Sequence, residues 1–385
     1  MPAAAQFRFM PLSEGRELFL PLRPPAATAG GLALYAPMHP AARAYRGLMV
    51  RAVRRGLAPF LLRSRPLSDK GGLPHLHHHG LVETVRAALK RPDAEFAIYQ
   101  GKEAVVRKPT LLAMEPDGRP IAYAKIGWNE ASRHLVEQEH QTLVFLGRQA
   151  LQHGRVAPVL GYLDLGHSRV LISTPLHHVN AAAEFALTPL HVAFLREVGS
   201  RALTLSPLAQ SAFWTRANER LGKLRAKLTR RETEILEAAL RRLSAGFGDA
   251  TLPWTLRLGD FLPWNFGLDK AAQRIDVVDL EFAERGSPLG WDVFHFLIGI
   301  RQPFRPVDIA AQAEGSPFRD YFAHFGIGSD RLPYLQLAYL VDLTLFFRYM
   351  WGDQTPVASA ERNMSIRLDA ISTVLRELGE APATR

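Results

Sequence analysis

The sequence Leu258-Gly-Asp-Phe-Leu-Pro-Trp-Asn265, followed closely by Val277-Val-Asp-Leu-Glu281, decides how the rest of the chain is interpreted. It places Asp260, then Asn265 five residues later, and then Asp279 at the end of an apolar run typical of a strand. Carboxylate and amide oxygens suit a divalent cation, and a carboxylate can also accept the proton of a hydroxyl nucleophile. Asp260 alone would more often be a helix cap, but the three residues together favour a site for phosphoryl transfer.

Two further candidates lie upstream, on different elements. Residues 120–126 are predicted to form a strand that carries Lys125, and a helix over residues 129–149 carries Glu139. A lysine that contacts phosphates can be oriented by a carboxylate from the following helix. Each residue alone is more simply a solvated surface group. Their order before the Asp260 motif favours a functional ion pair.

The chain is predicted to be α+β, with a small sheet followed by a mostly helical part. An N-terminal lobe over residues 93–175 is expected to contain one helix and five strands, at 96–99, 104–114, 120–126, 157–163 and 168–173. Residues 176–385 are expected to form a helical lobe with a catalytic loop at 256–268 and a metal-binding segment at 277–281. Its helices are predicted at 189–204, 209–228, 232–243, 291–300, 306–313, 331–349 and 357–378, with 318–325 as a connector.

The basic charge is confined to one end of the chain. Residues 1–92 hold 14 Lys and Arg against 4 Asp and Glu, so this segment carries the whole formal net charge of +10. In residues 93–385 the charges balance at 33 of each sign. Residues 1–92 are therefore predicted to be a basic, partly helical extension, with short strands at 18–22 and 31–35, a basic helix at 41–62 and a short helix at 81–89.

The basic helix at 41–62 has two interpretations. Arg43, Arg46, Arg51, Arg54 and Arg55 alternate with apolar residues near helical spacing. The simpler interpretation is a helix packed on the main domain with its arginines in solvent. The alternative is a surface helix that contacts an anionic membrane or a phosphate-bearing substrate. Nucleic-acid binding is not expected, because the segment lacks interleaved aromatics and any recognisable module.

Composition excludes several classes of protein. At 385 residues the chain can form two or three domains, and it has no cysteine for disulfides, thiolate nucleophiles or thiolate metal sites. No apolar run reaches the ~18–20 residues of a membrane span, and no signal peptide is indicated. We therefore expect a cytoplasmic protein, with peripheral membrane contact as an extension of that expectation. The histidine-rich segment 74–79 is expected to be a loop rather than a metal site.

The motifs resemble those of the aminoglycoside phosphotransferase and choline kinase group, small-molecule kinases with a two-lobed protein-kinase-like fold. The similarity spans about residues 95–350. Its most specific segments are Leu258–Asn265, Val277–Glu281 and Gly286-Ser-Pro-Leu-Gly-Trp-Asp292, and weaker support comes from Ala122–Lys125 and Glu139–Leu143.

The resemblance implies a role for each matching position. Asp260 would be the catalytic base, Asn265 and Asp279 would bind Mg²⁺, and Asp292 would brace the catalytic loop. On the nucleotide side, the implied residues are Lys125 at the phosphates, Glu139 orienting Lys125, the glycine-loop residues Gly101 and Lys102, and Ser173 within the hinge Ile172–Leu176 at the adenine.

Two positions depart from the pattern of the family. The family usually has His two residues before the catalytic Asp, and this chain has Leu258 there. The glycine-rich loop is reduced to Gly101 in Gln100-Gly-Lys-Glu-Ala104, where Lys102 and Arg107 could supply positive charge instead.

The expected function is therefore an ATP- or GTP-dependent, Mg²⁺-requiring kinase that phosphorylates a hydroxyl of a small molecule. The acceptor could be a sugar, a glycolipid headgroup, an amino alcohol or an aminoglycoside-like compound. The balanced charge of the C-terminal part favours a neutral or anionic acceptor over a polycation. The alternative is a non-catalytic, nucleotide-binding pseudokinase that acts as a regulatory or scaffold module, which Leu258 and the thin glycine loop favour.

Overall fold

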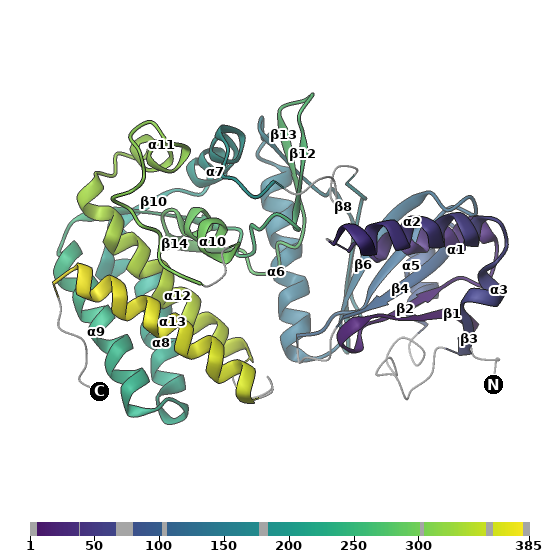
Figure 1. The fold of residues 1–385 in the computed structure, drawn as a ribbon, viewed down its shortest axis with the longest axis horizontal. Coiled ribbons are helices and arrows are strands. Elements are labelled where there is room, and N and C mark those ends of the chain that lie inside the picture. The colour runs from purple at the N-terminus through teal and green to yellow at the C-terminus, as the bar shows by residue number, and fades with distance from the viewer. Residues whose placement is uncertain are drawn as a thin grey trace. The chain divides into compact units, whose positions relative to one another are not determined.

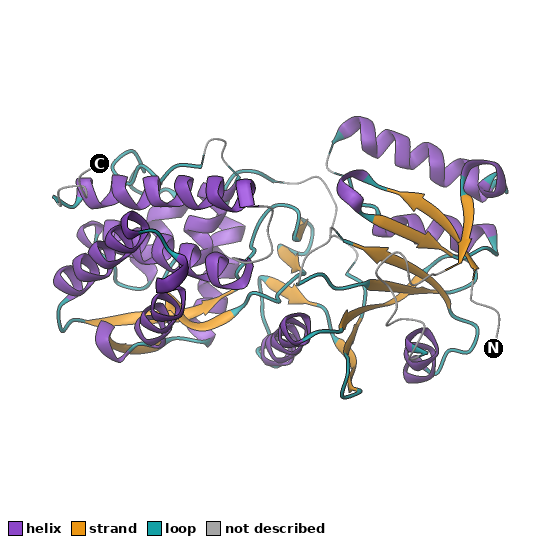
Figure 2. Cartoon of the chain, turned by 90° about the horizontal axis from the view of Figure 1, so that it is seen from below, coloured by secondary structure: helices purple, strands orange, loops and turns teal. Residues whose placement is uncertain are grey.

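The computed structural model describes residues 6–37, 39–66, 80–101, 106–176, 184–300, 304–351 and 357–379. They belong to two compact units, the first formed by Met1–Val144 and Ala157–His177, the second by Phe145–Val156 and His178–Arg385 (Figure 1). The first unit is built around a large sheet and the second is mostly helical (Figure 2). The predicted α+β class is confirmed.

The sheet of the first unit is antiparallel, with the strand order β3-β1-β2-β4-β5-β6-β9-β8. Its strands are β1 (Gln6–Pro11), β2 (Glu17–Leu20), β3 (Arg63–Pro66), β4 (Glu95–Gln100), β5 (Thr110–Met114), β6 (Pro120–Gly127), β8 (Val159–Asp164) and β9 (Arg169–Ser173). The last five correspond to the five predicted strands, although β5 is shorter than the predicted 104–114.

The prediction of a separate extension over residues 1–92 was wrong, because the N-terminal strands continue the sheet. Strand β2 pairs with β4, with Phe19 opposite Ile98. Leu18, Phe19 and Leu20 are all buried. Without this pairing, β4 would leave an open strand edge, so the N-terminal segment satisfies backbone groups as well as burying apolar surface.

The helical parts of this segment also differ from prediction. Residues 31–35 form the end of α1 (Pro25–Gly31) and a 3-10 turn (Leu32–Leu34) rather than a strand. The helix expected at 41–62 is divided into α2 (Pro40–Arg54) and α3 (Ala58–Leu61), because Gly56 takes a φ of +82° that a right-handed helix cannot contain. The predicted segments 74–79 and Lys102 lie outside the described residues.

Both faces of the sheet are covered. Alternate residues of a strand point to opposite faces, so Phe96 and Ile98 of β4 lie in one buried cluster and Ala97 in the other. The first cluster includes Leu81 and Val85 of α5 (Leu81–Leu89). The second includes Met49 and Val53 of α2. The sheet that contains β6, with Lys125, and β9, with Ser173, is therefore packed between two buried apolar clusters.

The second unit contains most of the helices and two small sheets. Its helices are α7 (Pro189–Arg201), α8 (Ala212–Leu224), α9 (Arg230–Phe247), α10 (Trp291–Gly299), α11 (Pro317–His324), α12 (Leu332–Trp351) and α13 (Val357–Glu377). Strand β11 (Thr251–Arg257) lies between β10 (Thr204–Pro207) and β14 (Glu284–Pro288). The other sheet has the order β12 (Phe266–Asp269), β13 (Arg274–Val277) and β7 (Gly154–Val156). Helix α6 (Glu130–Gly147) starts in the first unit and ends in the second.

Two local predictions in this unit were wrong. Residues 306–313 form turns rather than a helix, because Val307 exchanges both backbone hydrogen bonds with the side chain of Gln336 on α12. The supposed connector at 318–325 is helix α11, which Ser316 caps by accepting from the backbone N–H of Arg319 at 3.3 Å. Pro317 occupies the first helical position, where its missing N–H costs nothing.

Within the described ranges, each helix is too short or too polar to serve as a membrane span.

Candidate active site

The loop after β11 presents Asp260 by turning its neighbours inwards. Phe261 and Leu262 are buried, whereas the side chain of Asp260 is 30% exposed. A tight turn forms because the N–H of Leu262 donates to the carbonyl of Asp260 and the N–H of Asn265 donates to the carbonyl of Leu262, both at 2.8 Å. Gly259 has a φ of +91°, and a Cβ there would lie 2.3 Å from the carbonyl oxygen of Phe282. Only glycine fits this approach to the loop.

Asp260 and Asn265 are in direct contact. The side-chain amide of Asn265 donates to Asp260 Oδ2 at 2.7 Å and to the carbonyl of Asp260 at 3.0 Å. This arrangement fixes one carboxylate oxygen of Asp260. It also uses the donor end of the Asn265 amide, so the amide oxygen is the end that can bind a cation.

The segment that carries Asp279 is hydrogen-bonded to the backbone of Asn265. Phe266 pairs with Val277, and the N–H of Val278 donates to the carbonyl of Asn265 at 2.9 Å. Asp279 itself adopts a left-handed backbone with φ +58°. Such conformations are uncommon outside glycine and concentrate at functional sites, where the surrounding structure enforces them. The structure thus brings together Asp260, Asn265 and the segment of Asp279.

Asp292, in the first turn of α10, holds the start of the loop through hydrogen bonds to its backbone. Its two carboxylate oxygens accept the backbone N–H groups of Leu258 at 2.8 Å and Gly259 at 3.0 Å. Burial raises the pKa of Asp292 to about 6, although these two N–H donors favour its ionised form. One buried carboxylate therefore fixes the backbone immediately before Asp260.

The first unit contains the Lys125–Glu139 pair. Lys125 lies on β6, between β5 and β9, and Glu139 lies on α6. Lys125 Nζ contacts both carboxylate oxygens of Glu139, at 2.7 and 2.8 Å, and the Glu139 side chain is only 5% exposed. The ion pair predicted from the sequence is therefore present in the structure.

Ser173, Gly101 and Lys102 are the other residues predicted to contact the nucleotide. Ser173 ends β9 opposite Tyr123 and Val159, where the hinge was expected. Gly101 follows β4 directly, and a Cβ at this position would meet Tyr99 only at 3.9 Å. The fold therefore does not require glycine at position 101. Lys102 cannot be placed, since it lies outside the described residues.

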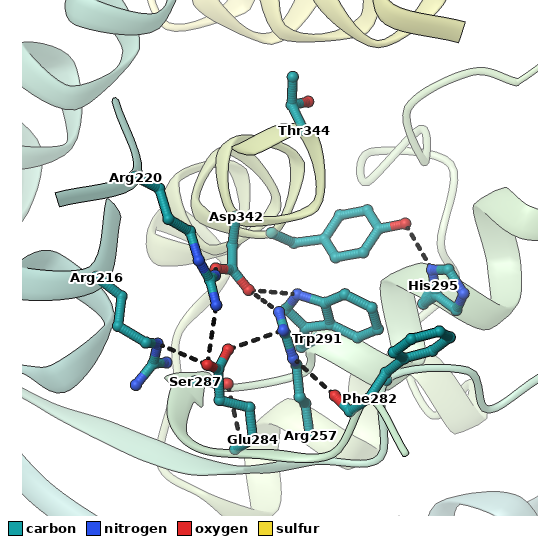
Figure 3. A network of polar contacts seen from close by, with 12 residues as sticks. Arg216, Arg220, Arg257, Phe282, Glu284, Ser287, Trp291, His295, Asp342 and Thr344 are labelled. Atoms are coloured by element: carbon teal, nitrogen blue, oxygen red, sulfur yellow. Dashed lines mark hydrogen bonds and ion pairs between the residues drawn. The ribbon is translucent and has the colours of Figure 1, made fainter. Parts of the chain in front are cut away.

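A buried ionic network beneath the loop was missed by sequence reasoning (Figure 3). Arg257, which directly precedes Leu258, is 1% exposed and contacts both Asp342 and Glu284. Arg220 also contacts both carboxylates, at 3.1 Å to Asp342 and 2.9 Å to Glu284. Arg216 contacts Glu284 at 3.2 Å. Burial opposes ionisation of Glu284, but these arginines still hold its pKa below the usual value.

Mg²⁺ fits the oxygens available at the loop. Among the described residues, no group of three or more His, Cys, Asp or Glu side chains could hold a metal ion. Mg²⁺ does not need such a group, because it keeps several water ligands and is commonly held by one or two side chains together with substrate phosphates. Asn265 and Asp279 would provide an amide and a carboxylate oxygen, which suit this hard cation.

Together, the elements described above form an α+β fold with a sheet-based unit and a mostly helical unit. The chain is similar to a solved structure from Haemophilus somnus 129PT assigned as a fructosamine-3-kinase, at 12% identity, over 77% of this chain and 96% of that one, with a TM-score of 0.50. It is also similar to aminoglycoside phosphotransferase APH(4)-Ia with ADP and hygromycin B, at 13% identity, over 78% and 99% of the two chains, with a TM-score of 0.49. A third similar structure is ADP-bound aminoglycoside phosphotransferase APH(2'')-Ib. The identity is 14%, the similarity covers 76% of this chain and 97% of that one, and the TM-score is 0.47.

At 12% identity, the similarity to the structure assigned as a fructosamine-3-kinase supports the fold and nothing more. No protein-family model matches the sequence, and comparison with curated proteins finds no sequence match. The roles of individual residues therefore depend on the geometry of this chain.

Proposed function

We propose that this chain is a small-molecule kinase that transfers the γ-phosphoryl group of ATP or GTP to a hydroxyl of its substrate. The observation that carries the proposal is the geometry of Asp260. Its carboxylate is partly exposed, Asn265 holds one of its oxygens, and Asp292 fixes the backbone that precedes it. Phosphoryl transfer depends mainly on such positioning and on charge stabilisation, with little covalent chemistry by the protein.

In this proposal Asp260 orients the acceptor hydroxyl and accepts its proton. Asn265 and Asp279 hold Mg²⁺, which when bound neutralises phosphate charge. Lys125 contacts the nucleotide phosphates, and Glu139 holds the Lys125 ammonium in place. We propose that Ser173 contacts the adenine and that Gly101 and Lys102 contact the phosphates, as the resemblance implies.

Nucleotide-dependent thermal stabilisation tests the proposal without knowledge of the acceptor. ATP and GTP with Mg²⁺ should raise the melting temperature of the wild-type chain, since a ligand that binds only the folded state stabilises it. Asp279→Asn should reduce the Mg²⁺-dependent part, and Lys125→Met should reduce stabilisation by nucleotide. If neither nucleotide changes the melting temperature, both the kinase and the pseudokinase interpretations fail. Nucleotide binding without transfer to any acceptor would instead favour the pseudokinase.

Trp264 supports an acceptor with an apolar ring face, such as a sugar. It lies four residues after Asp260 and is 37% exposed, although its neighbours Phe261 and Leu262 are buried. An exposed indole can pack against the face of a ring and still donate a hydrogen bond. We expect Trp264→Ala to raise the acceptor KM about tenfold and to leave the nucleotide KM within about twofold, equivalent to ~1.4 kcal/mol of lost acceptor binding. Equal KM values for wild type and variant would exclude this role.

We further propose that α2 and α3 contact an anionic membrane surface. The segment 40–63 contains six arginines and no acidic residue. Exposed apolar side chains accompany them: Leu48 is 64% exposed and Phe60 is 85% exposed. Helix α2 buries Met49 and Val53 in the first unit, whereas Leu48 and the arginines at 51, 54 and 55 are exposed among the described residues. Exposed arginines beside exposed apolar groups match the charge and the interior of an anionic bilayer surface.

Vesicle sedimentation tests this contact. The chain should bind vesicles of phosphatidylcholine with phosphatidylglycerol, and it should not bind pure phosphatidylcholine. Arg51→Gln/Arg54→Gln/Arg55→Gln should weaken binding at least tenfold, because each basic residue near such a surface contributes about 1 kcal/mol. A matched control removes three exposed arginines of α9: Arg230, Arg231 and Arg241. Equal loss in both triple variants, or equal binding to neutral vesicles, would overturn the proposal.

A further inference from the structure

The catalytic loop contains leucine where the resemblance predicts histidine. Leu258 is 1% exposed, so its side chain belongs to the core. Its backbone N–H donates to the carboxylate of Asp292. Asn265 holds Asp260 Oδ2 from within the loop. The other carboxylate oxygen, Oδ1, faces a residue from a different element.

That residue is His295, on α10, one helical turn after Asp292. His295 Nε2 lies 3.6 Å from Asp260 Oδ1, within charge-contact distance but longer than a hydrogen bond. Catalytic hydrogen bonds are often long before substrates bind and shorten in the reacting complex. The His295 side chain is only 9% exposed, so the imidazole is largely buried.

Two aromatic side chains fix the orientation of this ring. His295 stacks on Trp291, with centroids 4.7 Å apart and planes inclined by 27°. Its Nδ1 lies 3.2 Å from the hydroxyl of Tyr339 on α12. Trp291 is fixed in turn, because its Nε1 donates to Asp342 at 3.0 Å.

Two partners of His295 bear on which of its nitrogens carries the proton: the hydroxyl of Tyr339 at Nδ1 and the carboxylate of Asp260 at Nε2. Burial raises the pKa of Tyr339 well above its usual value, so the phenol stays protonated and can donate to Nδ1. In a neutral ring that accepts at Nδ1, the proton is on Nε2, which faces Asp260. In a protonated ring Nε2 carries a proton as well. An ionised carboxylate accepts hydrogen bonds and cannot donate them, so Asp260 Oδ1 beside Nε2 favours the tautomer in which Nε2 is the donor.

We propose that His295 is a positioning residue for Asp260, supplied by α10 in place of the missing loop histidine. Its Nε2–H holds Oδ1 while Asn265 holds Oδ2, so the carboxylate plane is fixed from both sides. Each carboxylate oxygen has more than one lone pair, which leaves an acceptor position for the substrate hydroxyl. This inference rests on the proposed kinase function and adds a residue that the Leu258–Asn265 motif does not contain.

Three variants separate donation from packing. His295→Phe keeps an aromatic ring but removes the donor, and we expect kcat to fall about 10- to 100-fold, since small misplacements of reacting groups have effects of this size. The nucleotide and acceptor KM values should stay within about twofold. His295→Gln can place an amide donor near the position of Nε2 and should recover most of the loss. Tyr339→Phe, which removes only the hydroxyl, should lower kcat by a smaller factor.

Tyr334→Phe is the matched control, because Tyr334 is on the same helix but packs against Phe247 of α9. Its kcat should equal that of wild type. The probe is transfer from Mg-ATP to an acceptor, or to water if hydrolysis of Mg-ATP is the measurable reaction. The inference is overturned if His295→Phe retains kcat within twofold, or if His295→Gln and His295→Phe lose equal activity.

Nitrogen-15 NMR of the chain with labelled histidine gives a readout independent of turnover. Nε2 of His295 should be protonated in wild type, and Tyr339→Phe should shift the population towards protonation at Nδ1. A wild-type ring protonated only at Nδ1 would contradict the inference, because Nε2 would then face a carboxylate without a proton. Failure of the kinase proposal is recognised separately, by Asp260→Asn retaining full activity.

Discussion

Replacing Asp260 with asparagine should lower kcat for phosphoryl transfer by about 10²- to 10⁴-fold, the range typical of general acid–base residues. The substitution keeps the size of the side chain and an oxygen that can accept from Asn265, so the loop should keep its shape. It removes the group that accepts the hydroxyl proton. The nucleotide KM should stay within about twofold, since Asp260 is proposed to act on the acceptor. Steady-state transfer from γ-labelled ATP measures both parameters.

Asp330→Asn provides the matched control for this substitution. Asp330 belongs to the same unit, and its side chain is 78% exposed. The control therefore makes the same chemical change without touching the loop, and its kcat should equal that of wild type. An Asp260→Asn variant that keeps kcat within about threefold would rule out Asp260 as the base.

The largest expected effect on stability comes from Asp342. This residue is fully buried and contacts Arg257, Arg220 at 3.1 Å and the indole N–H of Trp291 at 3.0 Å. Asp342→Leu leaves two buried guanidinium groups with Glu284 as their remaining partner in the network. Breaking a buried ion pair by removing one partner typically costs about 3–5 kcal/mol. We expect urea unfolding to show a loss of this size.

A double variant distinguishes lost charge balance from altered packing. The network of Arg257, Arg220, Arg216, Glu284 and Asp342 carries a net charge of +1, which Asp342→Leu raises to +2. Adding Arg257→Met restores +1, and replacing both partners of a buried pair by apolar residues is often neutral. The double variant should therefore recover at least half of the lost stability. If it is less stable than Asp342→Leu alone, uncompensated charge is not the cause.

An exposed ion pair provides the contrast. Arg230 is 92% exposed and contacts Glu234, one helical turn away, at 2.7 Å. Glu234→Gln should cost less than ~1 kcal/mol, as is usual for surface pairs.

Local sequence patterns were sufficient for most elements of the fold. The turn at 115–118 joins β5 to β6, and apolar periodicity located α6, α7 and α12. The pairing of β2 with β4 was missed because it connects residues about 80 positions apart, and short apolar runs do not specify a pairing partner. The turns at 306–313 were missed for a related reason, since the competing hydrogen bonds come from Gln336.

In the site, too, contacts between residues close in the sequence could be predicted, whereas a contact between distant residues could not. Asp260 and Asn265 could be identified from their spacing, since five residues form one loop. Lys125 and Glu139 could be paired from the order of strand and helix. His295 could not, because a histidine on an apolar helix is usually a core residue, and its contact with Asp260 spans 35 positions. Its position one turn after Asp292 was the only local signal.

The most direct test of the central claim is a search for phosphorylated product by mass spectrometry. Sugars, polyols, amino alcohols and aminoglycosides are incubated with Mg-ATP or Mg-GTP and either wild-type chain or Asp260→Asn. The account predicts that at least one hydroxyl compound gains a phosphoryl group with wild type and that the product is lost with Asp260→Asn. Equal product with both proteins, or no product with any acceptor together with no nucleotide binding, would contradict it.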